Sequence, residues 1–127
     1  MAFQPLTLIV VHGSFAICRL EPRAAAPSWA TTGDLISITH TADEVSVVCR
    51  QDAIPEGILS ERGWCCLRVV GTIPFSVVGV LASLTAPVAD AGISVFAIST
   101  FDTDYLLVKE KDLAVAMDAL RGFGHIV

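Results

Sequence analysis

Basic residues are scarce in this chain of 127 residues, in which 8 lysines and arginines stand against 13 aspartates and glutamates and the net charge is -5. Nucleic-acid binding needs clustered lysine and arginine side chains, so this composition argues against it. Only 17% of the residues are charged, whereas 54% are hydrophobic, and this balance excludes an intrinsically disordered chain. It predicts a large apolar core, together with apolar surface that a partner chain covers.

Cysteine spacing suited to a metal site is also missing. The cysteines form no CxxC pair and have no histidine-rich sequence beside them, as a zinc or redox motif would require. Residues 6–11 form an apolar run that is too short, and lacks the basic lead-in, for a secretion signal. We therefore predict a cytoplasmic protein without metal or cofactor, in which the cysteines serve as small apolar side chains: Cys18, Cys49, Cys65 and Cys66.

Residues 69–89 contain no charged side chain and are numerous enough to span a membrane. Gly71, Pro74, Gly79 and Pro87 interrupt this segment, however, and proline divides it into a strand-like and a helix-like part. A buried strand, a loop and a core helix explain the same composition. We therefore predict a protein that does not contact a membrane.

An internal repeat is what the sequence does contain. Residues 36–50 resemble residues 96–110, sixty positions later, so that Thr39 aligns with Ser99 and Glu44 with Asp104. Each copy has two apolar runs joined by a polar turn with acidic residues, which is typical of a β-hairpin. The chain is about twice as long as this offset, and it is therefore predicted to contain two copies of one small unit.

The apolar periodicity of the second half predicts a strand at 64–70, a helix from an N-cap at Ser76 to about Ala91, strands at 93–100 and 104–109, a helix at 111–122 and a closing strand at 124–127. Pro87 should kink the first helix or end its regular part early, and Gly92 should follow its end. This order is that of a ferredoxin-like βαββαβ unit.

The first half is predicted to have the same order with its first helix eroded and an extra hairpin in front. Its expected elements are strands at 6–11 and 15–20 around a turn at 12–14, strands at 35–40 and 45–50, and a short helix within 55–63. The predicted fold class is therefore α+β. Two ferredoxin-like units follow in tandem, residues 1–62 and 63–127, each with an antiparallel sheet and helices on one face.

A candidate site combines the loop and helix start at 71–80 with the turn at 99–104. Backbone N–H groups at a helix N-terminus hold a carboxylate or phosphate, and Gly79 leaves room for a ligand. Opposite them, Asp102 and Asp104 can bind an ammonium group, with threonine hydroxyls to orient it and Phe101 as an apolar wall. Such a site suits a free amino acid. The predicted residues are Ser76, Val77, Val78, Gly79, Val80, Thr100, Phe101, Asp102, Thr103 and Asp104.

Structural roles also explain several of these residues: Ser76 as a helix cap, Asp102 as a turn former and Phe101 as a core residue. An enzymatic role finds less support. His12, His40 and His125 lie on separate predicted elements, with His125 expected at the surface, and no serine or cysteine stands in a recognisable nucleophile motif. We predict that the protein is not an enzyme.

The segment ISTFDTDYLLV, at 98–108, resembles the ACT domains, small βαββαβ modules that sense amino acids. The similarity is to the subgroup in aspartate kinase regulatory regions and CASTOR arginine sensors. PVADAGI at 87–93 adds to it, and SITHTADEVSVV at 37–48 resembles the matching segment of the family's other domain. The resemblance implies regulation rather than catalysis, with domains paired side by side and an amino acid bound at their interface.

Carried over to this sequence, the resemblance places the ligand loop at 76–80 and its facing turn at Thr100, Phe101, Thr103 and Asp104, with Asp104 as the ammonium partner. The family often has acidic residues just before the helix, where this chain has Ser76 and Val77. A neutral or apolar amino acid is therefore expected rather than arginine. The resulting hypothesis is a free-standing, homodimeric amino-acid sensor that signals to an unidentified partner. The alternative is an interaction or assembly module without a ligand.

Overall fold

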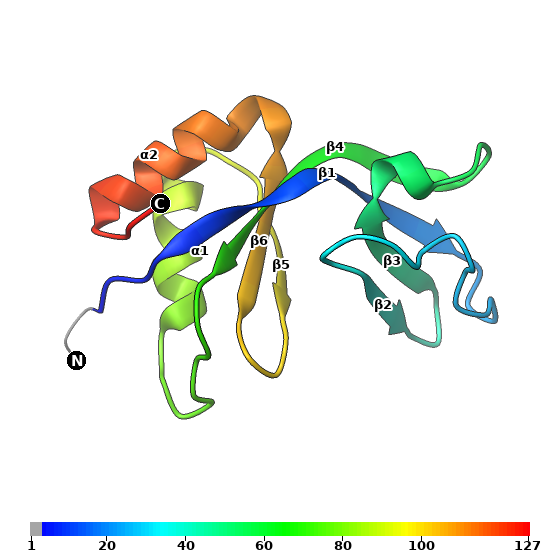
Figure 1. Ribbon diagram of the computed structural model, residues 1–127, viewed down its shortest axis with the longest axis horizontal. Helices are drawn as coiled ribbons and strands as arrows, with labels where there is room; N and C mark the ends of the chain where they lie inside the picture. Colours follow the sequence, from blue (N-terminus) through cyan, green and yellow to red (C-terminus); the bar gives the residue numbers. More distant parts are fainter. Residues whose placement is uncertain (1–3) are drawn as a thin grey trace. The chain divides into compact units, whose positions relative to one another are not determined.

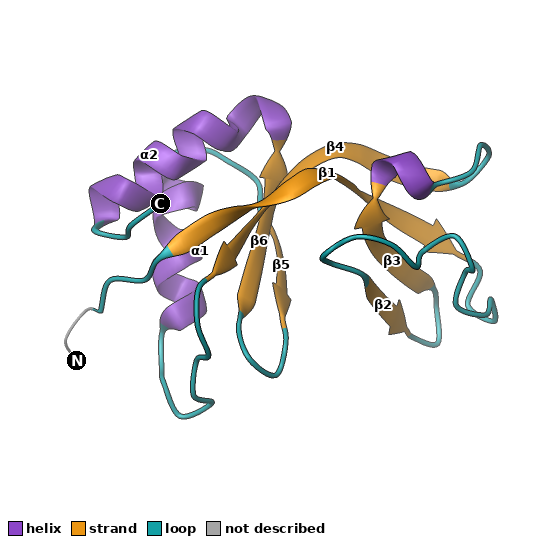
Figure 2. Cartoon of the chain, viewed as in Figure 1, coloured by secondary structure: helices purple, strands orange, loops and turns teal. Residues whose placement is uncertain are grey.

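The computed structural model describes residues 4–127, which form an α+β fold (Figures 1 and 2). Its strands are β1 (Leu8–Leu20), β2 (Ser37–His40), β3 (Val45–Arg50), β4 (Leu59–Val69), β5 (Phe96–Ser99) and β6 (Asp104–Lys109). Its α-helices are α1 (Val80–Asp90) and α2 (Leu113–Phe123), and two short 3₁₀ helices are η1 (Gln51–Ala53) and η2 (Glu110–Asp112).

Two compact units divide the chain between Val11 and His12 and again between Trp64 and Cys65. The N-terminal unit comprises His12–Trp64, and the C-terminal unit comprises Cys65–Val127 with the described residues up to Val11. Both long strands, β1 and β4, therefore contribute to both units. The strand order is β2-β3-β1-β4 in the N-terminal unit and β1-β4-β6-β5 in the C-terminal unit. The division into domains at residues 62 and 63 stays a prediction.

The C-terminal unit has the predicted order of strand, helix, strand, strand and helix, from β4 to α2. The predicted closing strand is reduced to one parallel bridge, between Thr7 and Ile126. Side chains four residues apart on each helix reach the same core, because that spacing places them on one helix face. The buried core consists of Leu8, Leu67, Val69, Leu84, Val88, Ile93, Leu106, Val108, Ala116 and Leu120.

Pro87 lies inside α1, and the helix continues past it to Asp90, so the predicted early end was wrong. Proline has no N–H, and the carbonyl of Ser83, four residues earlier, therefore lacks its usual helical donor. The ring of His125 replaces that donor, with Nε2 2.9 Å from the Ser83 carbonyl oxygen. The helix then ends as predicted, with Gly92 in the left-handed region at φ +79°.

His125 was expected at the surface, but it is only 4% exposed. Its Nδ1 accepts a hydrogen bond from the Leu6 N–H at 3.1 Å, so the proton that faces the Ser83 carbonyl belongs to Nε2. The ring also stacks on Phe123, with 5.7 Å between the ring centroids. The imidazole thus pairs two partly buried backbone groups, the Leu6 N–H and the Ser83 carbonyl.

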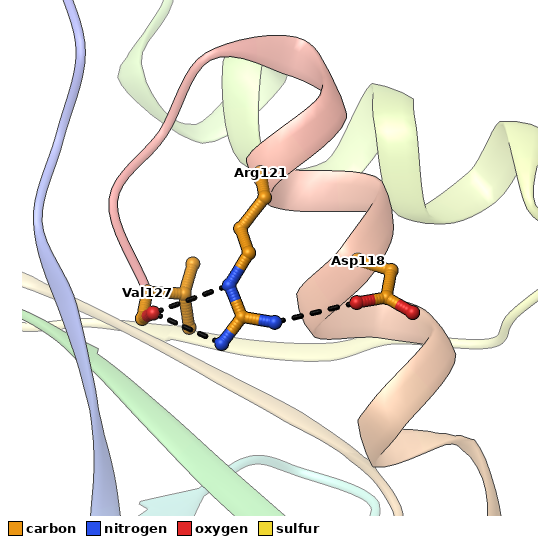
Figure 3. Close-up of polar contacts among 3 residues, drawn as sticks. All are labelled: Asp118, Arg121 and Val127. Carbon is orange, nitrogen blue, oxygen red and sulfur yellow. Dashed lines mark hydrogen bonds and ion pairs between the residues drawn. The ribbon is translucent and has the colours of Figure 1, made fainter.

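Arg121 of α2 fastens the last residues of the chain (Figure 3). Its Nε and Nη2 donate to the Val127 carbonyl oxygen at 3.3 and 3.1 Å, while its Nη1 donates to the Asp118 carboxylate at 3.3 Å. Residue 127 is thereby held beside the helix that carries Arg121.

The N-terminal unit, all of whose residues are described, contains strands and η1 but no α-helix. The predicted hairpin at 12–14 was wrong, because β1 is one continuous strand in which Gly13 adopts φ +104°. The predicted short helix within 55–63 was also wrong, because the chain turns at Gly57 and then extends into β4. The core of this unit comprises Ala16, Cys18, Ala30, Val45, Val47, Cys49 and Ile54.

The internal repeat is present, but with an offset of fifty-nine residues rather than sixty. Ser37 of β2 corresponds to Phe96 of β5, and η1 corresponds in the same way to η2. The strand pairing agrees: His40 lies opposite Val45 as Ser99 lies opposite Asp104. A shift of one residue exchanges the two faces of a strand. Asp104 therefore corresponds to the buried Val45, and not to Glu44 as the sequence alignment predicted. Two complete ferredoxin-like units in tandem stay a prediction.

Candidate functional site

The start of α1 differs from the prediction. The helix begins at Val80, and its N-cap is Gly79 at φ +83° rather than Ser76. Glycine tolerates this left-handed conformation without the steric cost that a side chain brings. The residues before it form a turn in which the Val77 N–H donates to the Pro74 carbonyl at 3.1 Å. The N–H of Val77 is therefore used within the loop.

Free N–H donors lie one turn later than expected. The first helical hydrogen bond runs from the Ser83 N–H to the Gly79 carbonyl at 2.9 Å. The N–H groups of Val80, Leu81 and Ala82 precede it and have no acceptor within the helix. Together with the helix dipole, these three groups make the helix start attractive to an anion.

The turn between β5 and β6 faces this helix start. The Thr100 N–H donates to the Thr103 carbonyl at 2.9 Å, and the Thr100 hydroxyl donates to the same oxygen at 3.1 Å. The buried Thr103 hydroxyl donates to the Val69 carbonyl at 2.8 Å. Both hydroxyls thus hold the turn in place. The Asp104 carboxylate accepts a hydrogen bond from the Ser99 hydroxyl, which orients it at the start of β6.

One open cavity of about 280 Å³ lies between the turn and the helix start. A backbone hydrogen bond of 2.7 Å from the Ile73 N–H to the Asp102 carbonyl ties the two loops together beside it. The predicted residues that line the cavity are Val77, Gly79, Val80, Thr100, Phe101, Thr103 and Asp104. Ser76, Val78 and Asp102 do not belong to the lining.

Five lining residues are not among the individually predicted ones: Ile73, Pro74, Phe75, Leu81 and Ser99. All of them except Leu81 lie within the predicted segments 71–80 and 99–104. Two of them left a signal in the sequence. Ser99 is the residue that pairs with Asp104 across the hairpin, so the correct strand register would have identified it. Phe75 is the single aromatic residue of the loop at 71–78, and it is exposed rather than part of the core.

The mouth of the cavity is apolar. Phe75 and Phe101 are 76% and 78% exposed, and their rings meet edge to face with centroids 5.0 Å apart. Phe101 is therefore not a core residue. We call the exposed apolar side chains here the apolar rim: Phe75, Val77, Val78, Leu81 and Phe101. A contiguous apolar surface beside a polar pocket is typical of a place where a ligand or another chain binds.

Other potential sites found no support in the described part of the chain. No group of three or more histidine, cysteine, aspartate or glutamate side chains within residues 4–127 is arranged to hold a metal ion. Burial raises the pKa of the Cys49 thiol to about 11 and that of Cys66 to about 12, so neither is an activated nucleophile. Over the same residues, no helix has both the length and the apolar character needed to cross a membrane.

A family model described as ACT domain matches residues 59–122, and the chain belongs to the ACT domain family. A second model, for an N-terminal domain, matches residues 13–57. The sequence resemblance to this family is thereby confirmed. The family match covers β4 to α2, the segment that contains the whole cavity.

Individual proteins resemble the chain over most of its length. The crystal structure of a protein from Agobacterium tumefaciens has 39% sequence identity and a TM-score of 0.92, and the match covers 98% of this chain and 92% of that one. The human protein CASTOR3P is 31% identical over 90 residues, which are 61% of this chain and 55% of the human protein. The chain thus matches about half the length of this curated relative.

The ligand-free regulatory subunit of aspartate kinase from Thermus thermophilus has the same fold. Its TM-score is 0.65 at 12% identity, and the match covers 92% of this chain and 97% of the subunit. At this identity the similarity concerns the fold alone. Membership of the ACT domain family supports a small-molecule regulatory role for the chain.

Proposed function

We propose that this protein binds a free amino acid in the cavity of its C-terminal unit and acts as a regulator rather than an enzyme. One observation carries the proposal: the Asp104 carboxylate and the start of α1 line the same cavity. The N–H groups of Val80 and Leu81 would bind the ligand's carboxylate. Asp104 would bind its ammonium group through a charge-assisted hydrogen bond.

The walls of the cavity favour a neutral or apolar side chain on the ligand. Among the lining residues Asp104 is the single ionised group, and it is assigned to the ammonium group. A guanidinium or a second ammonium would then find no further countercharge, and an unpaired charge is costly where water is displaced. Phe75 and Phe101 instead offer aromatic surface to an aliphatic or aromatic side chain.

A second copy of the chain is the proposed cover for the apolar rim. Phe75, Val78 and Phe101 are each more than two thirds exposed, and burying them in a homodimer would remove this apolar area from water. The ligand would then lie between two chains in the cytoplasm and be shared by them. Ligand binding would shift the dimer toward one of two arrangements only if the affinity for the ligand differs between these arrangements.

Thermal unfolding in the presence of each proteinogenic amino acid tests the proposal. A ligand at about 100 times its Kd adds about 2.7 kcal/mol to the free energy of unfolding. For a chain of this size that corresponds to a rise in Tm of about 10 °C. Asp104→Asn should abolish the rise. Asp102→Asn is the matched control, because Asp102 lies in the same turn but does not line the cavity, and it should leave the rise intact.

An interaction module without a ligand is the alternative, and the exposure of Phe75 and Phe101 is the observation that favours it. Under this alternative no amino acid changes Tm. Phe75→Ser with Phe101→Ser would still convert a dimer to monomers in sedimentation velocity. A Tm rise that Asp104→Asn does not change would contradict the proposed site itself.

A further inference from the structure

The N-terminal unit contains a second open cavity, of about 290 Å³. In the strand pairing Arg19 lies opposite Ser46, while the neighbouring pair, Cys18 and Val47, belongs to the core of this unit. Successive side chains on a strand point to opposite faces. Arg19 and Ser46 are therefore on the face away from that core. The lining residues are Ile17, Cys18, Arg19, Glu44, Ser46, Leu59, Ser60 and Glu61.

Groups of opposite charge meet at this cavity. One Nη2 hydrogen of Arg19 is donated to the Asp43 carbonyl at 3.1 Å. The second Nη2 hydrogen remains available to a ligand, together with that of Nε or Nη1 beside it. The half-buried Glu44 has a carboxylate with no hydrogen bond or ion pair to any residue of 4–127. The hydroxyl of Ser46 stands on the same wall.

Apolar side chains complete the lining. Leu59 is 69% exposed, which is unusual for a leucine on a strand, and Ile17 of β1 lines the cavity with it. The lining thus combines two carboxylates, a guanidinium, two hydroxyls and two aliphatic side chains, a mixture of a few polar groups on an apolar surface that polar ligand sites use. The volume of the cavity is small compared with that of most ligand pockets, and it suits a ligand of a few heavy atoms.

We propose that this cavity is a second ligand site, and that it binds a small zwitterion with a carboxylate and an ammonium group on a short apolar frame. Arg19 binds the carboxylate, with two N–H groups in the planar geometry that carboxylates match. Glu44 binds the ammonium group, and Ile17 and Leu59 contact the apolar part. The proposal is independent of the C-terminal cavity and does not rest on the function proposed for it.

The test uses the full chain with Asp104→Asn, in which the carboxylate of the C-terminal cavity is absent. Amide chemical shifts are recorded by NMR while each proteinogenic amino acid is added at millimolar concentration. Saturable shifts at Ile17, Ser46 and Ser60 are expected with at least one of them. Shifts confined to the start of α1 would report the other cavity, and the absence of any saturable shift at these three amides would overturn the proposal.

Matched variants then test the contacts. Arg19→Met and Glu44→Gln should each weaken binding by about 10- to 100-fold, because each removes one charged hydrogen-bond partner. Arg23→Met and Glu56→Gln make the same changes at exposed positions outside the lining and should leave the affinity unchanged. The methyl ester and the N-acetyl form of the ligand should both fail to bind. Undiminished binding by Arg19→Met, or by either blocked ligand, would overturn the proposal.

Discussion

His125 and Pro87 jointly determine how the Ser83 carbonyl group is paired, and a double-mutant cycle can measure this relation. In a regular helix the N–H of residue 87 would donate to the carbonyl of residue 83. Pro87 has no such group, and His125 Nε2 lies 2.9 Å from that oxygen instead. The other ring nitrogen accepts the Leu6 N–H at 3.1 Å. Loss of the imidazole would leave two backbone groups without partners.

The variant His125→Phe keeps a ring that can stack on Phe123 but removes both hydrogen bonds. A buried polar group left without a partner costs about 1–3 kcal/mol, so the loss of both partners should lower the free energy of unfolding by about 2–6 kcal/mol. In a Pro87→Ala background the new N–H can donate to Ser83. There, His125→Phe should cost only about 1–3 kcal/mol, the part that belongs to the Leu6 N–H.

Urea denaturation followed by circular dichroism gives the four free energies of the cycle. Loss of the buried Pro87 ring lowers the stability of both Pro87→Ala proteins equally, so this cost cancels in the cycle. The expected coupling is about 1–3 kcal/mol, the cost of the Ser83 carbonyl alone, which is above the scatter of about 0.5 kcal/mol found between independent sites. If His125→Phe costs the same in both backgrounds, Pro87 is not the reason why His125 is placed beside Ser83.

Helical periodicity made the C-terminal half predictable. The positions of Leu84 and Val88 in α1, and of Ala116 and Leu120 in α2, repeat every four residues, and all four side chains are buried. The N-terminal half has no such pattern. Its interior glycine, Gly13, reads as a hairpin turn, but it lies within a strand where the Arg50 side chain crosses close to the backbone. Only the fold distinguishes these two uses of glycine.

Side chains of the candidate site could be predicted from the sequence, but the backbone conformation at the helix start and the strand register could not. Asp104 and Phe101 were predicted as an ammonium partner and an apolar wall, and both line the cavity, whereas Asp102, predicted together with Asp104, does not. The helix start was displaced because Ser76 is a good N-cap by residue type, whereas the left-handed Gly79 is the actual N-cap. The repeat was found, but alternating strand residues look similar after a shift of one, so its register required the structure.

Two further predictions concern a glycine beside the Arg50 side chain and two buried cysteine thiols. A Cβ on Gly13 would lie 2.5 Å from Arg50 Nε, at φ +104°, whereas one on Gly57 would meet nothing within 4 Å at φ +87°. In urea denaturation Gly13→Ala should therefore cost about 2–4 kcal/mol and Gly57→Ala only the backbone strain of about 1–2 kcal/mol; equal costs would contradict the steric argument. Burial also raises the pKa of the Cys49 thiol to about 11 and that of Cys66 to about 12, from an ordinary 9.0. Above pH 9.0 the unfolded chain therefore loses protons that the folded chain keeps. The contribution of these thiols to the free energy of unfolding is therefore complete below that pH. Above it, the free energy of unfolding should fall by about 1.4 kcal/mol per pH unit for each thiol. Urea denaturation across this range should show the fall in the parent protein and a flatter profile after Cys49→Ala, and the same slope in both would show that this thiol is not its source.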